Sequence, residues 1–268
     1  MPDLLQLGDH TLRLGDVTHV MGVINVSPDS KNTHTIARSV DEALAMAERY
    51  RQWGASLIDL GGQSSHYDNP TIEVADEISR VVPAIEALSS EDHPVAIDTW
   101  KPEVAEAAVQ AGAVIVNDTG GLADPAMRDQ VRRSGVAAVA VYIEGANPHA
   151  VGEVDIRDDK AQRTADGFRV LLEELEADGI HNVILDPGIA LNYRGDYEAY
   201  SRMQLEVIAG SDHLHSLNRP VLIAIPRKRD GHRLAVYMGL AVEHEADIIR
   251  VHDVAMACDI VRLFGRTP

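Results

Sequence analysis

The sequence predicts an α/β protein folded as a single (β/α)8 barrel. Short apolar runs rich in Val and Ile alternate with longer amphipathic stretches, and about eight such pairs follow one another along the chain. Runs that are apolar at consecutive positions are typical of parallel strands buried on both faces. An open doubly wound sheet is the alternative. We favour closure because no glycine-rich dinucleotide-binding pattern follows the first run and because the number of units suits a barrel.

The expected strands share a Val/Ile-rich, apolar character and cover residues 19–26, 56–61, 95–99, 114–117, 137–143, 182–187, 220–225 and 248–252. The expected helices are amphipathic and cover residues 40–53, 72–88, 102–111, 125–134, 159–178, 196–208, 232–244 and 254–264. Pro102 and Pro125 suit the first turn of a helix. Four glycines suit helix ends because they readily adopt left-handed backbone angles: Gly54, Gly112, Gly135 and Gly179. We expect the polar stretch 144–159 to be a long surface loop.

The composition is that of an ordinary globular protein, with 45% apolar and 25% charged residues among 268. Barrels of this type commonly take about 250 residues, so we expect one domain over residues 1–268. Asp and Glu outnumber Lys and Arg by 42 to 24. The resulting net charge of -18 disfavours nucleic acid and anionic membranes as partners.

The chain also lacks signals for export or membrane insertion. Residues 1–9 have no basic region of the kind that opens a signal peptide, and no apolar run approaches the ~20 residues of a spanning helix. A single cysteine, Cys258, cannot form an intramolecular disulfide and suits a reducing compartment. We therefore expect a soluble, cytoplasmic protein.

Polar side chains stand where the expected strands end, which in a barrel is the side of the reaction site. Asp98, Asn117 and Asp186 each end an otherwise apolar run, and Lys228 follows another strand. A carboxylate that accepts two N–H groups from a guanidine-like ring edge makes a selective contact, so this set suits a planar, nitrogen-rich heterocycle. Helix capping is the alternative for an Asp at such a position, and we favour it for Asp118 and Asp253.

A second set stands on the first and last strands, which become neighbours when a barrel closes. Asn25, Arg250 and His252 together form a candidate anion site, because phosphates often bind at this end of the fold. The alternatives are an outward salt bridge from Arg250 to Asp247 or Asp253, and a backbone-bonded His252 at the edge of the core. The sequence has no zinc-site spacing, P-loop or nucleophile elbow.

Seven segments, in order along almost the whole chain, resemble the signatures of dihydropteroate synthases. They are residues 21–30 (MGVINVSPDS), 58–65 (IDLGGQSS), 97–102 (IDTWKP), 116–118 (VND), 185–188 (LDPG), 227–228 (RK) and 250–254 (RVHDV). The resemblance implies a TIM barrel that acts in folate biosynthesis. Such enzymes join 7,8-dihydropterin-6-ylmethyl diphosphate to p-aminobenzoate and release diphosphate, usually with Mg²⁺ and as homodimers.

The resemblance also implies roles for individual residues. The pterin-binding set is Asp98, Asn117, Asp186 and Lys228. The diphosphate-binding set is Asn25, Ser65, His66, Arg250 and His252, with Asn25 as the Mg²⁺ ligand. Asp98, Lys228 and Arg250 are the expected catalytic residues. In the family the C–O bond cleaves to leave a cationic pterin, which the aniline attacks, and Asp98 would stabilise that cation.

The chain departs from the family on the side of the amine acceptor. Residues 31–35 read KNTHT where Phe-Ser-Asp-Gly-Gly is usual, and residues 64–68 read SSHYD where Ser-Thr-Arg-Pro-Gly is usual. Residues 190–193 read ALNY in place of Gly-Phe-Gly-Lys, while Pro226 and Arg229 replace serines that flank the Arg-Lys pair. The family's residues are therefore retained on the pterin side of the site and replaced on the p-aminobenzoate side.

Three functions are compatible with this pattern. The first is a synthase-like transferase that uses p-aminobenzoate or another nucleophile. The second is a pterin-binding paralogue without synthase activity, which the altered loops favour. The third is a methyltetrahydrofolate-dependent methyltransferase, which Lys228 and residues 250–252 disfavour because methyl transfer has no evident use for them. We favour the transferase, because a protein that binds only pterin would not need the anion site.

Overall fold

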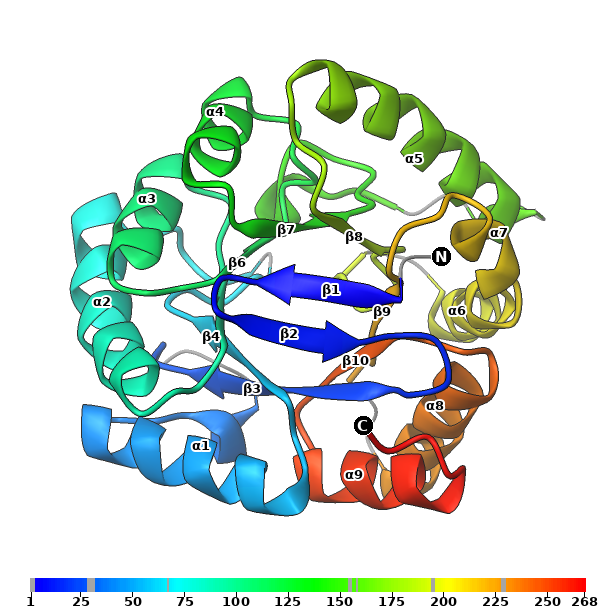
Figure 1. Ribbon diagram of the computed structural model, residues 1–268. Coiled ribbons are helices and arrows are strands. Elements are labelled where there is room, and N and C mark those ends of the chain that lie inside the picture. The colour runs from blue at the N-terminus through cyan, green and yellow to red at the C-terminus, as the bar shows by residue number, and fades with distance from the viewer. Residues whose placement is uncertain are drawn as a thin grey trace.

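Eight parallel strands form a barrel surrounded by helices (Figure 1). The computed structural model describes residues 3–27, 32–66, 68–153, 156–157, 159–193, 196–227 and 230–268. The barrel strands are β3 (His19–Asn25), β4 (Leu57–Gly61), β5 (Val95–Asp98), β6 (Ile115–Asp118), β7 (Ala137–Val141), β8 (Val183–Asp186), β9 (Leu222–Ala224) and β10 (Ile248–Val251). Their order, β8-β7-β6-β5-β4-β3-β10-β9, places the first strand of the barrel, β3, beside the last, β10.

A single parallel bridge between Leu185 and Val221 closes the sheet, next to a hydrogen bond of 2.9 Å from the Leu185 amide to the Pro220 carbonyl. The expected (β/α)8 fold is therefore confirmed. The observed strands lie at the expected positions and differ at their ends by at most two residues.

The helices also follow the sequence expectation. They are α1 (Val40–Trp53), α2 (Val74–Ser90), α3 (Pro102–Gln110), α4 (Pro125–Ser134), α5 (Lys160–Ala177), α6 (Tyr197–Ala209), α7 (Ser211–His215), α8 (Gly231–Glu243) and α9 (Val254–Leu263). Gly54 and Gly135 end α1 and α4 with φ angles of 110° and 70°, in the left-handed region that glycine adopts without strain. The sequence analysis missed the short helix α7 and the 3-10 turns at Thr33–Thr35 and Pro148–Ala150.

A two-stranded hairpin, also missed, precedes the barrel. Its strands β1 (Leu4–Leu7) and β2 (His10–Arg13) pair antiparallel and cross the barrel end that faces the viewer in Figure 1. Leu5, Leu7 and Leu12 pack with residues from the amino-terminal parts of the barrel strands. The hairpin therefore covers the end of the barrel opposite the predicted site.

Two apolar layers make the core. The outer layer lies between the strands and the helices. The inner layer fills the barrel and includes Leu57, Ala96, Ile115, Ile184 and Ile248, one from each of five strands. Because side chains alternate between the faces of a strand, residues two positions after these also face the interior, nearer the carboxyl ends of the strands.

The hairpin gives a matched test of the inner core. We expect Leu7→Ala to lower the free energy of unfolding by about 2–5 kcal/mol, because Leu7 is completely buried among inner-layer residues. Leu4→Ala, on the same strand but 61% exposed, is the control and should change it by less than about 0.5 kcal/mol. Urea unfolding followed by circular dichroism measures both, and equal effects would contradict the hairpin's role as a barrel cover.

Candidate functional site

The period of two along each strand brings five polar side chains to the barrel interior. Each of them stands two positions after a residue of the inner apolar layer: Asp59, Asp98, Asn117, Asp186 and Arg250. They come from β4, β5, β6, β8 and β10. Three are almost fully buried, with exposed fractions of 0% for Asp59, 2% for Asn117 and 3% for Asp186.

Arg250 holds this group together. Its Nε donates to Asp59 Oδ2 at 2.7 Å, and its Nη2 donates to Asp98 Oδ2 at 2.6 Å. Asn117 Nδ2 donates to the other Asp59 oxygen at 3.0 Å. Asn117 Oδ1 is consequently turned away from Asp59, and it is buried with no hydrogen-bond partner among the described residues. Asp186 accepts a hydrogen bond of 2.8 Å from the Gly188 amide.

Among the described residues, one cation, Arg250, therefore lies among three buried or largely buried carboxyl groups. The pKa values of Asp98 and of Asp186 are raised to about 7 each: burial is the largest cause and the charge of Asp59 adds to it, while Arg250 acts to lower them. Burial acts to lower the pKa of Arg250, but the neighbouring carboxylates outweigh it and hold the pKa above its ordinary value. In their ionised form Asp98 and Asp186 only accept hydrogen bonds, as does the Asn117 oxygen, so a ligand rich in N–H groups fits them.

A cavity lies above this cluster, where the loops that follow the strands meet. Its described lining residues come from both predicted sets and from the loops: Asn25, Asn32, Gln63, Ser64, Ser65, His66, Asp98, Ala190, Asn192, Ile225, Arg227, Arg250 and His252. Of the predicted site residues, Asn117 and Asp186 lie outside this lining but belong to the buried group below it. Lys228 lies outside the described residues.

His252 is neutral in this environment. Burial, and electrostatic repulsion from the nearby Arg250, His34 and Arg227, lower its pKa to about 3. The Asn32 amide donates to Nε2 at 2.9 Å, so the ring proton lies on Nδ1, which is buried without a partner among the described residues. His252 can therefore give an anion a hydrogen bond but no positive charge.

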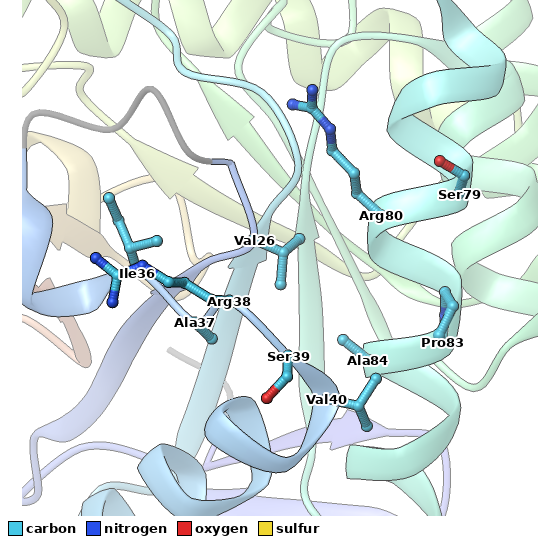
Figure 2. Close-up of a pocket in the computed structure, with 10 residues that line it drawn as sticks. All are labelled: Val26, Ile36, Ala37, Arg38, Ser39, Val40, Ser79, Arg80, Pro83 and Ala84. Carbon is cyan, nitrogen blue, oxygen red and sulfur yellow. The ribbon is translucent and has the colours of Figure 1, made fainter.

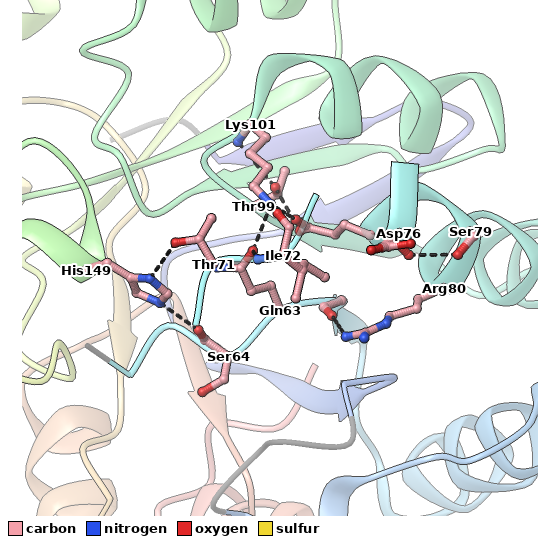
Figure 3. Close-up of polar contacts among 12 residues, drawn as sticks. Gln63, Ser64, Thr71, Ile72, Asp76, Ser79, Arg80, Thr99, Lys101 and His149 are labelled. Carbon is pink, nitrogen blue, oxygen red and sulfur yellow. Dashed lines mark hydrogen bonds and ion pairs between the residues drawn. The ribbon is translucent and has the colours of Figure 1, made fainter. Parts of the chain in front are cut away.

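The loop that carries Ser65 and His66 is anchored on both sides, as Figure 3 shows. Lys101 Nζ donates to Gln63 Oε1 and to the Ile72 carbonyl, both at 2.7 Å, and lies 2.8 Å from a Glu77 carboxylate oxygen. On the other side His149 lies within 3.0 Å of the Ser64 carbonyl and of Thr71 Oγ1. The sequence analysis missed these anchors because they join segments far apart in the chain.

A separate hollow lies on the flank of the barrel between α1 and α2 (Figure 2). Val26, Ala37 and Ala84 form part of its apolar lining, and the guanidinium groups of Arg38 and Arg80 stand on different sides of it (Figure 2). None of the predicted site residues is among its described lining, so we place the functional site at the barrel mouth.

The contacts of Asp253, Asp118, Arg250 and His252 distinguish structural from functional roles. Asp253 caps α9 by accepting from the Met256 amide, as expected. Asp118 faces outward and accepts from the Gly120 and Leu122 amides, so it holds its own loop and does not cap a helix. The outward salt bridge considered for Arg250 is wrong, since Arg250 pairs inward. The backbone-bonded His252 is also wrong, because its partner is a side chain.

Comparison with known proteins decides the family. The family model described as "Pterin binding enzyme" matches residues 21–262. Dihydropteroate synthase of Bacillus subtilis is 32% identical over 266 residues, with 92% of this chain and 87% of that protein covered. The chain belongs to the dihydropteroate synthase family.

Further members show the same relationship. A probable bifunctional folylpolyglutamate synthase/dihydropteroate synthase of Halobacterium salinarum is 34% identical over 94% of this chain, but the chain spans only 32% of that longer protein. The crystal structure of Burkholderia cenocepacia dihydropteroate synthase complexed with 7,8-dihydropteroate superposes with a TM-score of 0.82 at 29% identity, covering 98% and 96% of the two chains.

Several departures from the family's usual dihydropteroate synthase pattern lie at the cavity. Ser65, His66, Ala190 and Asn192 line it, and Pro226 is buried next to the retained Arg227. Residues 28–31, which follow the first signature strand, lie outside the described residues, as does Arg229. The altered positions thus border the same cavity as the retained ones.

The charge imbalance predicts a pH-dependent effect of removing Arg250. We expect Arg250→Met to lower the free energy of unfolding by about 3–5 kcal/mol near pH 8, because three carboxyl groups lose their buried counter-charge. A carboxyl whose folded pKa lies above its unfolded value takes up a proton in the folded state as the pH falls. The loss should therefore be smaller near pH 5.5.

Urea unfolding at the two pH values measures this difference. Arg51→Met is the control, because Arg51 pairs with Glu48 at the surface and its loss should cost less than about 1 kcal/mol at either pH. An Arg250→Met effect that did not change with pH would show that Asp98 and Asp186 do not depend on this cation.

Proposed function

We propose that this chain catalyses the dihydropteroate synthase reaction, joining 7,8-dihydropterin-6-ylmethyl diphosphate to p-aminobenzoate with release of diphosphate. The observation that carries the proposal is the acceptor group formed by Asp98, Asp186 and Asn117 Oδ1, where the described residues place one arginine among three carboxyl groups. The pyrimidine edge of a pterin supplies several N–H donors in one plane. Such a ring would satisfy these acceptors together.

The same charge imbalance supports the bond-breaking step. When the methylene C–O bond breaks, its electron pair leaves with diphosphate and positive charge develops on the ring. Ionised Asp98 and Asp186, with Asp59 behind them, stabilise that charge in a site that excludes most water. The amine nitrogen then attacks the methylene carbon and loses a proton. Lys228 is assigned to the pterin by the family motif alone.

The leaving group is assigned to the cavity side of the site. Ser65, His66 and neutral His252 supply hydrogen bonds there, and Arg250 lies between this cavity and the carboxyl cluster. Asn25 Nδ2 donates to Thr35 Oγ1 at 2.7 Å, which leaves its amide oxygen to face a cation. Mg²⁺ binds oxygen and commonly uses few protein ligands plus substrate phosphates, so Asn25 fits as its protein ligand. Bound Mg²⁺ would neutralise charge on the diphosphate.

Two alternatives are less well supported. A methyltetrahydrofolate-dependent methyltransferase has no evident need for the anion-binding residues. A pterin-binding paralogue without activity is disfavoured by the likeness to dihydropteroate synthases over nearly the whole chain.

The setting of the activity is also a proposal. We expect a homodimer because members of the family usually form one. The single cysteine, which is buried, supports a cytoplasmic location. Among the described residues, no helix has the length and apolar character needed to cross a membrane.

Diphosphate release tests the function directly. We expect the purified chain to release diphosphate from the pterin diphosphate with Mg²⁺ and p-aminobenzoate, and to form dihydropteroate in equal amount. Asp186→Ala should lower pterin affinity roughly ten- to hundredfold, because a buried acceptor of ring N–H groups is lost. Asp178→Ala, at the surface end of α5, is the control. Pterin binding without dihydropteroate formation would favour the inactive paralogue.

The same assay tests the effect of the replaced residues on p-aminobenzoate binding. The aromatic clamp and the serines that the family uses for p-aminobenzoate are replaced. Each lost contact should weaken the binding free energy of p-aminobenzoate by roughly 1–3 kcal/mol. We expect a KM for p-aminobenzoate about a hundredfold above that of the Bacillus subtilis enzyme assayed alongside, and correspondingly weak sulfonamide inhibition. Equal KM values would show that other residues, such as Lys31, His34 or Arg229, restore the site.

A further inference from the structure

Asp59 lies between the two predicted sets of site residues and belongs to neither. It is completely buried on β4, and it binds Arg250 through Oδ2 and Asn117 through Oδ1. Arg250 was assigned to the diphosphate and Asn117 to the pterin ring. Both oxygens of one carboxylate are therefore used to hold one residue from each set.

The carboxylate dictates which way the Asn117 amide faces. An ionised carboxylate can only accept hydrogen bonds, so Asn117 must present its NH₂ group to Asp59. The amide oxygen is then turned away and is left buried without a partner among the described residues. An unsatisfied buried acceptor destabilises the protein, and an N–H group of a ligand would remove that cost by donating to it.

We propose that Asp59 is a positioning residue for the pterin: it orients Asn117 as an acceptor and holds Arg250 against Asp98, without touching the substrate itself. The proposal rests on the proposed function, because it names how that site selects a ring edge rich in N–H groups. Replacing the carboxylate by an amide would let position 59 donate, and Asn117 could then reverse and lose its acceptor role.

Asp59 also acts on the site through its charge. In the part of the chain that the structure describes, the charged and titratable groups facing Asp186 are Arg250, which lowers its pKa, Asp59, which raises it, and the neutral phenols of Tyr193 and Tyr200. Removing the charge of Asp59 would lower the Asp186 pKa from about 7. Pterin needs the ionised carboxylate, so its affinity falls as the pH falls through this pKa. The midpoint should thus move to lower pH when Asp59 becomes neutral.

Two variants separate the position of the carboxylate from its charge. Asp59→Asn keeps the size and removes the charge, while Asp59→Glu keeps the charge and displaces it by one methylene. Titration calorimetry with pterin at several pH values should show at least tenfold weaker binding for both at pH 8. The midpoint of the pH dependence should fall for Asp59→Asn and stay unchanged for Asp59→Glu. Asp247→Asn, which removes a buried carboxylate at the opposite end of the barrel, should alter neither.

The outcomes that overturn the proposal are distinct. Wild-type affinity and an unchanged midpoint in both folded variants would show that Asp59 does not position the ring site. If neither variant folds, Asp59 serves the stability of the barrel and the proposal is wrong. Failure of the unaltered chain to bind pterin would instead contradict the proposed function, before any variant is compared.

Discussion

The ion pair between Asp59 and Arg250 is the contact on which the arrangement of the site depends. It joins β4 to β10 across the barrel interior and, through Asn117 and Asp98, reaches β6 and β5 as well. Removing one partner of a buried pair leaves an uncompensated charge, which is far more costly than losing a surface pair. The contact therefore fixes the geometry of the acceptor group, in which the described residues supply one cation for three carboxyl groups.

Much of the fold follows from the sequence because both faces of the parallel strands are buried. The apolar runs and the helix boundaries at Pro102, Pro125, Gly54 and Gly135 place most elements within three residues. The N-terminal hairpin was missed because its buried leucines alternate with exposed residues, Leu4 among them, over only four positions per strand, and because it packs on the barrel end. Such a signal is too short to separate from a loop.

The site was predictable to the extent that strand periodicity allows. Every second residue of a strand faces the same side, and this period separates Asn117, which faces the barrel interior, from its neighbour Asp118, which holds a loop. The same count also finds Asp59, which the sequence analysis placed in a signature without giving it a role. The loop anchors Lys101 and His149 could not be found this way, because their contacts depend on how separate loops meet in space.

The excess of carboxyl groups over cations around Arg250 is tested most directly by the number of protons that are released or taken up when pterin binds. Isothermal titration calorimetry with pterin in two buffers of different ionisation enthalpy gives that number at each pH. Near pH 6, below the pKa of about 7 of Asp98 and Asp186, binding should release about one proton or more, because the ring selects ionised carboxylates. Near pH 8 the release should be close to zero. The same proton count at both pH values would contradict the account of one arginine among three buried carboxyl groups.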